Sequence, residues 1–156
     1  MTYAVVNTKA LDVLVVVHSI SAIAALAVLV ALRAAAIGIA RSDTRSELAA
    51  RSFTGRPEVA GRIVHLVPLT GLAVTSVSLG AYSLSTGFVD VGLALWLVAA
   101  ASLELVAFPA QREVAAALVS SPKEAQLAAR RMARAVELAG LALVAAAIVM
   151  IAATSQ

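Results

Sequence analysis

Long apolar segments alternate with more polar connections along this 156-residue chain. Four apolar runs cover residues 10–32, 63–86, 91–110 and 135–153, with boundaries that are approximate to a few residues. Each run is close to the ~20 residues that an α-helix needs to cross a bilayer. The pattern predicts an all-α fold, a four-transmembrane-helix bundle of two antiparallel hairpins. The chain 1–156 is then a single integral membrane domain.

The charge of the connections predicts an orientation. Nearly all the basic residues fall in the first and third connections, and the second connection, 83–90, has none. The first connection contains Arg33, Arg41, Arg45, Arg51, Arg56 and Arg62, and the third contains Arg112, Lys123, Arg130, Arg131 and Arg134. Basic residues collect on the cytoplasmic side of membrane proteins. We therefore expect a multi-pass protein of a bacterial cytoplasmic membrane, with its N-terminus and C-terminus outside.

Composition supports the membrane interpretation and excludes several classes of function. Hydrophobic residues make up 62% of the chain and charged residues 13%, whereas a soluble domain has ~25% charged residues. The formal net charge is +3, but the basic residues flank the spans, so we expect contact with the lipid bilayer and no binding of nucleic acid. The chain has no Cys, which excludes disulfides and thiolate metal sites.

Local signals predict several helix boundaries. The first helix should continue past Arg33 into residues 34–40, since this stretch is rich in Ala. Pro68 predicts a kink in the second helix, because proline cannot donate a backbone hydrogen bond. Ser121 followed by Pro122 and by Glu124 is the pattern of a helix start with a capping box.

Ionisable side chains inside a span are expensive, so each is a functional candidate. The candidates are Asp12, His18, His65, Glu104 and Glu137. Asp12 suits the outer start of a helix, where a negative charge complements the helix dipole. At 1.5 Å per residue, His18 lies about 10 Å below the outer surface and His65 about 5 Å from the cytoplasmic side. Their separation of about 15 Å across a ~30 Å core argues against both histidines binding one haem.

Three of these candidates fall at similar depth on the cytoplasmic half. His65, Glu104 and Glu137 could form a polar intramembrane cluster, with Arg33, Arg62 or Arg134 as counter-charges. One interpretation is a cluster that accepts protons or binds a ligand. The other is a set of structural contacts between helices. No catalytic set and no metal-ligand spacing is recognisable in the chain, so an enzyme is the less favoured class.

His18 has two interpretations of its own. It precedes Ser19 and Ser21, which gives the outer half of the first helix a polar patch. In the functional interpretation His18 is a single axial ligand of haem b or a donor to a quinone. In the structural interpretation it is a packing residue bonded to a backbone carbonyl or to Ser and Thr of the second helix. Trp96, near the outer end of the third span, suggests an interfacial anchor.

Several short segments also indicate a family. They are residues 17–22 (VHSISA), residues 78–84 (SLGAYSL), residues 95–97 (LWL) and residues 148–150 (IVM). With these segments the chain resembles the DUF2269 family of small bacterial membrane proteins and is distantly similar to the CopD-like and HemJ-like four-helix groups. The resemblance implies four spans. In the HemJ-like group a first-span histidine is linked to haem, so it also implies His18 as the residue nearest to a cofactor.

The sequence leaves three functions open. The leading prediction is a non-enzymatic membrane subunit that packs with itself as a homo-oligomer or binds a larger membrane complex. The first alternative is a haem-associated or redox protein that uses His18. The second alternative is a proton-coupled carrier that uses Glu104 and His65.

Overall fold

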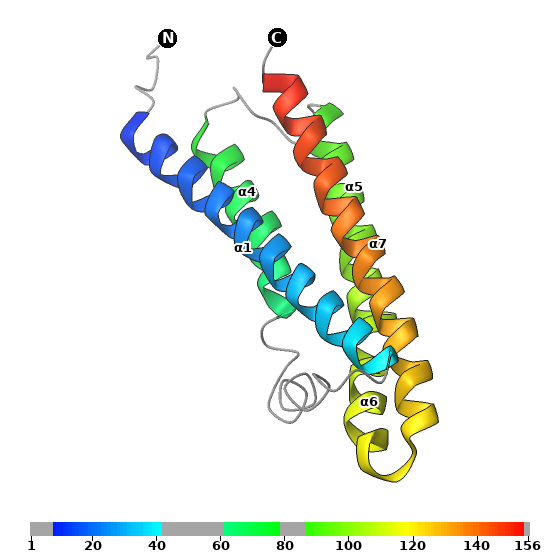
Figure 1. Cartoon of the computed structure of the whole chain (residues 1–156). Coiled ribbons are helices and arrows are strands. Elements are labelled where there is room, and N and C mark those ends of the chain that lie inside the picture. The colour runs from blue at the N-terminus through cyan, green and yellow to red at the C-terminus, as the bar shows by residue number, and fades with distance from the viewer. Residues whose placement is uncertain (1–7, 42–60, 79–86, 155–156) are drawn as a thin grey trace, which may run out of the picture.

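The computed structural model describes residues 8–41, 61–78 and 87–154, and every regular element in these ranges is helical (Figure 1). In chain order they are α1 (Thr8–Ala40), the 3₁₀ turn η1 (Arg62–His65), α4 (Leu66–Val77), α5 (Gly87–Ser102), the π-helical turn η2 (Leu103–Ala107), α6 (Phe108–Ser120) and α7 (Pro122–Thr154). The prediction of an all-α fold is confirmed.

Three helical stretches are long and apolar enough to cross a membrane: Lys9–Ala40, Gly87–Leu118 and Pro122–Ala153. A fourth apolar helix, Arg62–Val77, is shorter than these. The predicted second span, 63–86, extends beyond it, and residues 79–86 lie outside the described part of the chain. The membrane character predicted from the sequence therefore rests on three helices.

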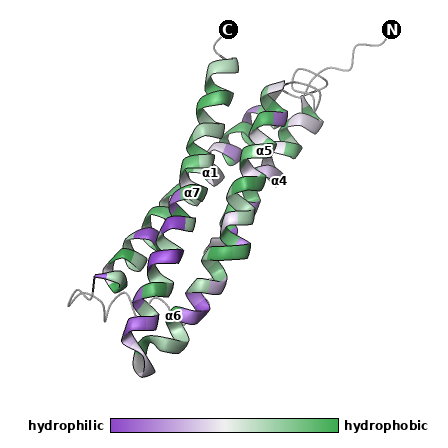
Figure 2. Ribbon diagram, turned by 90° about the vertical axis from the view of Figure 1, so that its right-hand side faces the viewer, coloured by the Kyte–Doolittle hydropathy of each residue, from purple (hydrophilic) through white to green (hydrophobic). Residues whose placement is uncertain are grey.

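The helix α7 holds the other helices together. It packs against α1, α5 and α6, whereas α4 packs mainly on α1. Figure 1 shows that α1 and α5 run in one direction and α4 and α7 in the other, so that the start of α1 and the end of α7 lie at the same end of the molecule. The turn between α6 and α7 lies at the opposite end, where Figure 2 shows most of the hydrophilic residues.

Small side chains allow this close packing. The buried face of α7 consists largely of alanine, including Ala128, Ala129, Ala135, Ala139 and Ala142. Small residues at helix interfaces let two backbones approach closely, which favours association of helices in a membrane. Larger side chains fill the remaining space, with Leu103 buried in the π turn and Phe108 buried directly after it. The outward faces carry exposed Val, Leu and Ile on α1, α4, α5 and α7, as expected of helices that contact lipid.

Two prolines shape the backbone where α4 and α6 begin. The 3₁₀ turn η1 lies just before Pro68, and the π turn η2 just before Pro109. In η2 the Phe108 N–H donates to the Leu103 carbonyl, five residues earlier. Pro109 cannot donate to the carbonyl four residues before it, and its ring crowds that carbonyl, so a wider turn accommodates it.

The helix boundaries test the local sequence signals. α1 ends at Ala40 and α7 begins at Pro122, both as predicted. Beyond the third predicted span, 91–110, helical structure continues through η2 and α6 to Ser120. The π turn absorbs the effect of Pro109, so the proline does not end the helical stretch.

Candidate functional site

An ionisable pair connects η1 with the π turn. His65 Nε2 lies 3.0 Å from Glu104 Oε1, and the two side chains are 32% and 41% exposed. The His65 ring also meets the indole of Trp96 edge-on, with centroids 5.9 Å apart and an interplanar angle of 79°. The sequence places His65 and Glu104 at similar depth, and the structure brings them into contact.

The two proline-associated turns position this pair. His65 is the last residue of η1 and Glu104 is the second residue of η2. Each residue therefore lies in a short segment whose hydrogen bonding departs from the regular α-helix. Single π turns inside helices occur frequently at functional sites. The observation makes the contact of His65 with Glu104 the leading candidate site.

Two buried polar groups near this part of the molecule were missed by the sequence analysis. The Trp96 Nε1 atom and both side-chain polar atoms of Gln111 are buried, and none of these three atoms has a hydrogen-bond partner within the described part of the chain. The Trp96 N–H is therefore enclosed by the protein, and its role as an interfacial anchor stays a prediction. Buried polar groups are normally hydrogen-bonded. The periodicity of apolar residues along the sequence does not indicate which buried polar atoms lack a partner.

Glu137 lies apart from the pair. Its Oε2 atom is 3.1 Å from Arg33 Nη2, an ion pair that joins α7 to α1. Of the three residues grouped by depth, His65 and Glu104 are in contact. Glu137 instead pairs with a cation on another helix. Arg33 was one of the counter-charges considered from the sequence. Side chains at one depth can point in different directions around a bundle, which explains the division.

His18 is tied to α4. Its Nδ1 atom lies 2.9 Å from Thr70 Oγ1, and that hydroxyl lies 2.8 Å from the Leu66 carbonyl and 3.0 Å from the Val67 carbonyl. A hydroxyl has one hydrogen to donate. Since that hydrogen is directed at the α4 carbonyls, Thr70 accepts from His18, and we assign the proton of the imidazole to Nδ1. The Nε2 atom then carries the lone pair.

The polar patch predicted around His18 is smaller than its sequence suggests. Ser19 and Ser21 donate back to carbonyls of their own helix, those of Val15 and Val17. Such bonds satisfy the hydroxyls locally. The imidazole itself lies against Gly71, where an added Cβ would be 3.2 Å from His18 Cε1.

The donor chemistry of His18 fits a single axial ligand. A histidine that binds a metal usually donates its other ring N–H to an acceptor, and Thr70 is such an acceptor. Within the described ranges, no group of three or more His, Cys, Asp or Glu side chains could hold a metal ion.

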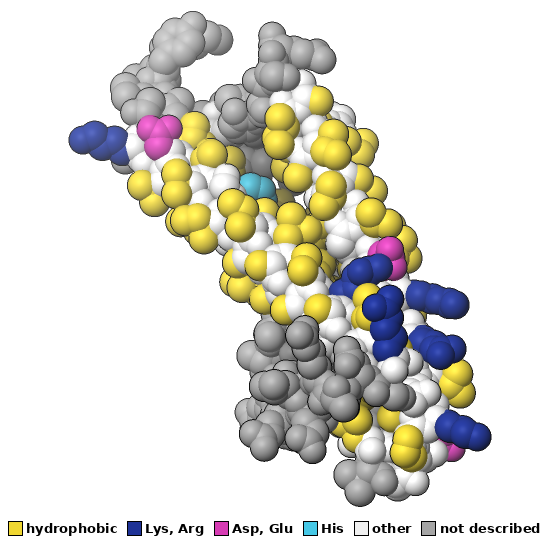
Figure 3. Space-filling view, viewed as in Figure 1, with side chains coloured by type: hydrophobic (Ala, Val, Ile, Leu, Met, Phe, Trp, Pro, Cys, Tyr) yellow, Lys and Arg dark blue, Asp and Glu magenta, His cyan; other side chains and the backbone are white. Residues whose placement is uncertain are grey.

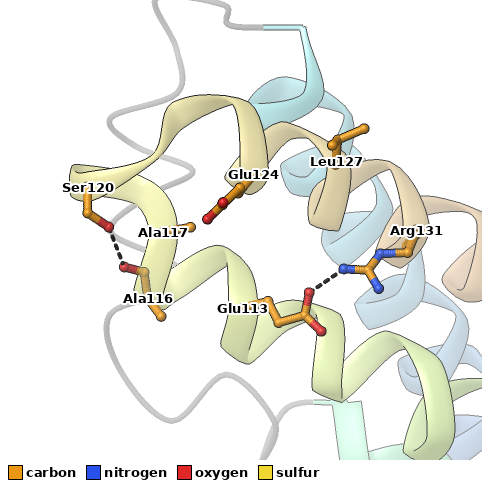
Figure 4. Close-up of a pocket in the computed structure, with 7 residues that line it drawn as sticks. All are labelled: Glu113, Ala116, Ala117, Ser120, Glu124, Leu127 and Arg131. Carbon is orange, nitrogen blue, oxygen red and sulfur yellow. Dashed lines mark hydrogen bonds and ion pairs between the residues drawn. The ribbon is translucent and has the colours of Figure 1, made fainter.

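A surface pocket lies elsewhere, in the hairpin formed by α6 and the start of α7 (Figure 4). It is lined by Glu113, Ala116, Ala117, Ser120, Glu124, Leu127 and Arg131. Glu113 and Arg131 form an ion pair across it, and Ser120 donates to the Ala116 carbonyl over 3.4 Å. These groups largely satisfy one another. The pocket contains none of the site residues predicted from the sequence.

No family model, no curated protein and no solved structure matches this chain. The similarity to the DUF2269 family rests on the segments quoted above and stays a prediction.

Proposed function

We propose that the chain is a four-span protein of a bacterial cytoplasmic membrane with both termini outside. The gathering of basic residues toward the α6–α7 end supports this orientation (Figure 3), because basic residues favour the cytoplasmic side. The chain has no Cys, so the labelling of a single introduced cysteine shows on which side of the membrane that position lies. A cysteine at Thr86 should react with an impermeant maleimide in intact cells, and one at Ser52 only after permeabilisation. The reverse pattern would overturn the orientation.

We propose further that the protein is a non-enzymatic subunit that binds a protein partner in the membrane. The observation that carries this proposal is the partial exposure of the His65–Glu104 pair on the lateral surface of the helix bundle. The neighbouring Leu69 and Leu105 are 60% and 75% exposed. An ionisable side chain that faces hydrocarbon within a span is energetically costly. A partner that covers the pair would remove this cost.

Photo-crosslinking in native membranes tests this function. A photoreactive amino acid at Leu105 should yield protein cross-links, since this residue adjoins Glu104. The same probe at Leu141, which is 63% exposed on α7, serves as the control and should react with lipid. Lipid adducts alone at both positions would refute the partner-binding proposal.

A proton-coupled carrier is the second candidate, favoured by the 3.0 Å contact of His65 with Glu104. A histidine that shares a hydrogen bond with a carboxylate can pass a proton to it or take one from it. Glu104→Gln keeps the size and polarity of the side chain but removes its charge. Proton uptake into proteoliposomes, followed with a pH-sensitive dye, should then be lost. Unchanged uptake in a folded variant would exclude this candidate.

A haem-associated protein is the third candidate, favoured by the bond from His18 Nδ1 to Thr70. That bond leaves Nε2 as the coordinating atom, and a bound haem b would supply one-electron redox chemistry. Protein purified from haem-replete cells should show a Soret band that His18→Ala abolishes and His65→Ala retains. A colourless wild-type protein would exclude this candidate.

A further inference from the structure

One face of α7 carries charge at its cytoplasmic end and apolar side chains beyond it. Arg130, Arg134 and Glu137 follow one another at spacings of four and three residues, so they share a face. All three are exposed. The Arg33–Glu137 ion pair adds a guanidinium from α1 to the same place.

The charges on this face do not cancel. Glu137 is paired with Arg33, and the adjacent Arg131 is paired with Glu113. Arg130 and Arg134 make neither an ion pair nor a hydrogen bond through their side chains to the residues that the structure describes. Like charges one helical turn apart repel each other. An anion between Arg130 and Arg134 would convert this repulsion into two attractions.

The same face continues into the membrane as an apolar strip. Leu141, Val144 and Ile148 extend the spacing of four and three residues, and they are 63%, 42% and 61% exposed. Figure 3 shows this division along α7, with Lys and Arg side chains gathered at the end near α6 and apolar side chains beyond them. From Glu137 to Ile148 the helix rises about 16 Å, which is close to one leaflet of a ~30 Å hydrocarbon core.

We propose that this face binds an anionic phospholipid, with its phosphate between Arg130 and Arg134 and its acyl chains along Leu141, Val144 and Ile148. Guanidinium groups match phosphate oxygens in a bidentate geometry, which favours Arg over Lys at such a site. An apolar strip directly beyond the arginines selects an amphiphile over a water-soluble anion. The site is on α7 and is independent of the His65–Glu104 face.

Titration of the purified protein in a neutral detergent tests the site. Stabilisation against heat gives an apparent affinity for an added ligand, and the ligands are phosphatidylglycerol, phosphatidylcholine with the same acyl chains, and inorganic phosphate. Phosphatidylglycerol should stabilise the protein at concentrations where the other two do not. The Arg130→Gln/Arg134→Gln variant should bind it about 25-fold more weakly, at about fivefold for each basic residue near an anionic headgroup.

The matched control is Arg41→Gln/Arg112→Gln, which removes the same charge at the same end of the molecule, from the end of α1 and from α6, and leaves the α7 face intact. It should keep the wild-type affinity. An equal loss in this control would replace the site by a general field of positive charge and overturn the proposal. So would equal stabilisation by inorganic phosphate, which would identify a site for free phosphate.

Two further variants separate a binding role from a structural one. Glu137→Gln removes the carboxylate beside the site and releases Arg33, so phosphatidylglycerol should bind more tightly. Arg130→Lys/Arg134→Lys keeps the charge but lacks the guanidinium fork, and should bind with intermediate affinity. Helicity measured by circular dichroism without lipid shows whether each variant is folded. A folded Glu137→Gln variant with weakened binding would contradict the placement of the phosphate.

Discussion

Replacement of Gly61 by alanine is the sharpest test of the contact between the start of η1 and the start of α6. A Cβ added at Gly61 would lie 2.5 Å from Phe108 Cε1 and 2.7 Å from Phe108 Cζ. Carbon atoms in good contact are about 3.5–4.0 Å apart, so the backbone and the ring must separate by about 1 Å. The ring cannot easily turn away, because Phe108 is only 1% exposed.

The expected cost follows from this overlap. Overpacking a core costs about 1–3 kcal/mol. The backbone at Gly61 has φ −64° and ψ −29°, which alanine adopts without strain, but Gly61 is the N-cap of η1, where alanine has no advantage over glycine. We expect Gly61→Ala to lower the free energy of unfolding by about 1–3 kcal/mol. His65 follows Gly61 by one turn and Glu104 precedes Phe108 by one turn, so the same displacement should open the His65–Glu104 pair.

Gly140 provides the matched control. A Cβ there would meet nothing within 4 Å, so Gly140→Ala should raise the free energy of unfolding by about 0.5–1 kcal/mol. Unfolding in mixed detergent with increasing dodecyl sulfate measures both variants. The single tryptophan of the chain, Trp96, contacts His65, so its emission should change in Gly61→Ala and stay unchanged in Gly140→Ala. Equal stability of Gly61→Ala and wild type would refute the close contact with Phe108.

Two other predictions concern contacts between helices. Ser102 donates to the Ala135 carbonyl over 2.8 Å in a buried position, so Ser102→Ala should cost about 1 kcal/mol of unfolding free energy, and no loss in the same unfolding assay would contradict that bond. Gly71→Ala would place a Cβ 3.2 Å from the His18 ring and strain its bond to Thr70, so it should destabilise the protein. In a His18→Ala background the same change should be neutral or stabilising, and equal effects in both backgrounds would contradict the contact.

The sequence predicts the ends of helices better than the contacts between them. The end of α1 and the start of α7 depend on local signals, an alanine-rich stretch up to Ala40 and a proline after Ser121. Both signals act within one or two turns of the residue concerned, so they can be read without knowledge of the fold. The all-helical architecture follows in the same way from the length of the apolar runs.

The contacts depend on the direction in which each side chain leaves its helix. The helices are apolar on almost every side, so periodicity does not show which face is buried. Depth alone grouped Glu137 with His65 and Glu104, although Glu137 faces α1. The π turn shifts the direction of every later side chain in its helix, and Pro109 by itself does not reveal whether a helix kinks, ends or widens.

The long hairpin has a mechanical consequence. The helical stretch Gly87–Ser120 is about 50 Å long, so about 20 Å of it extends beyond a ~30 Å hydrocarbon core. The Glu113–Arg131 ion pair ties this extension to α7, and two stiff helices joined in this way move as one lever. The π turn is the point where the hydrogen-bond ladder of the lever is widened, and so where it bends most easily. A lateral force on the turn between α6 and α7 would therefore rotate the backbone at Glu104, in the π turn.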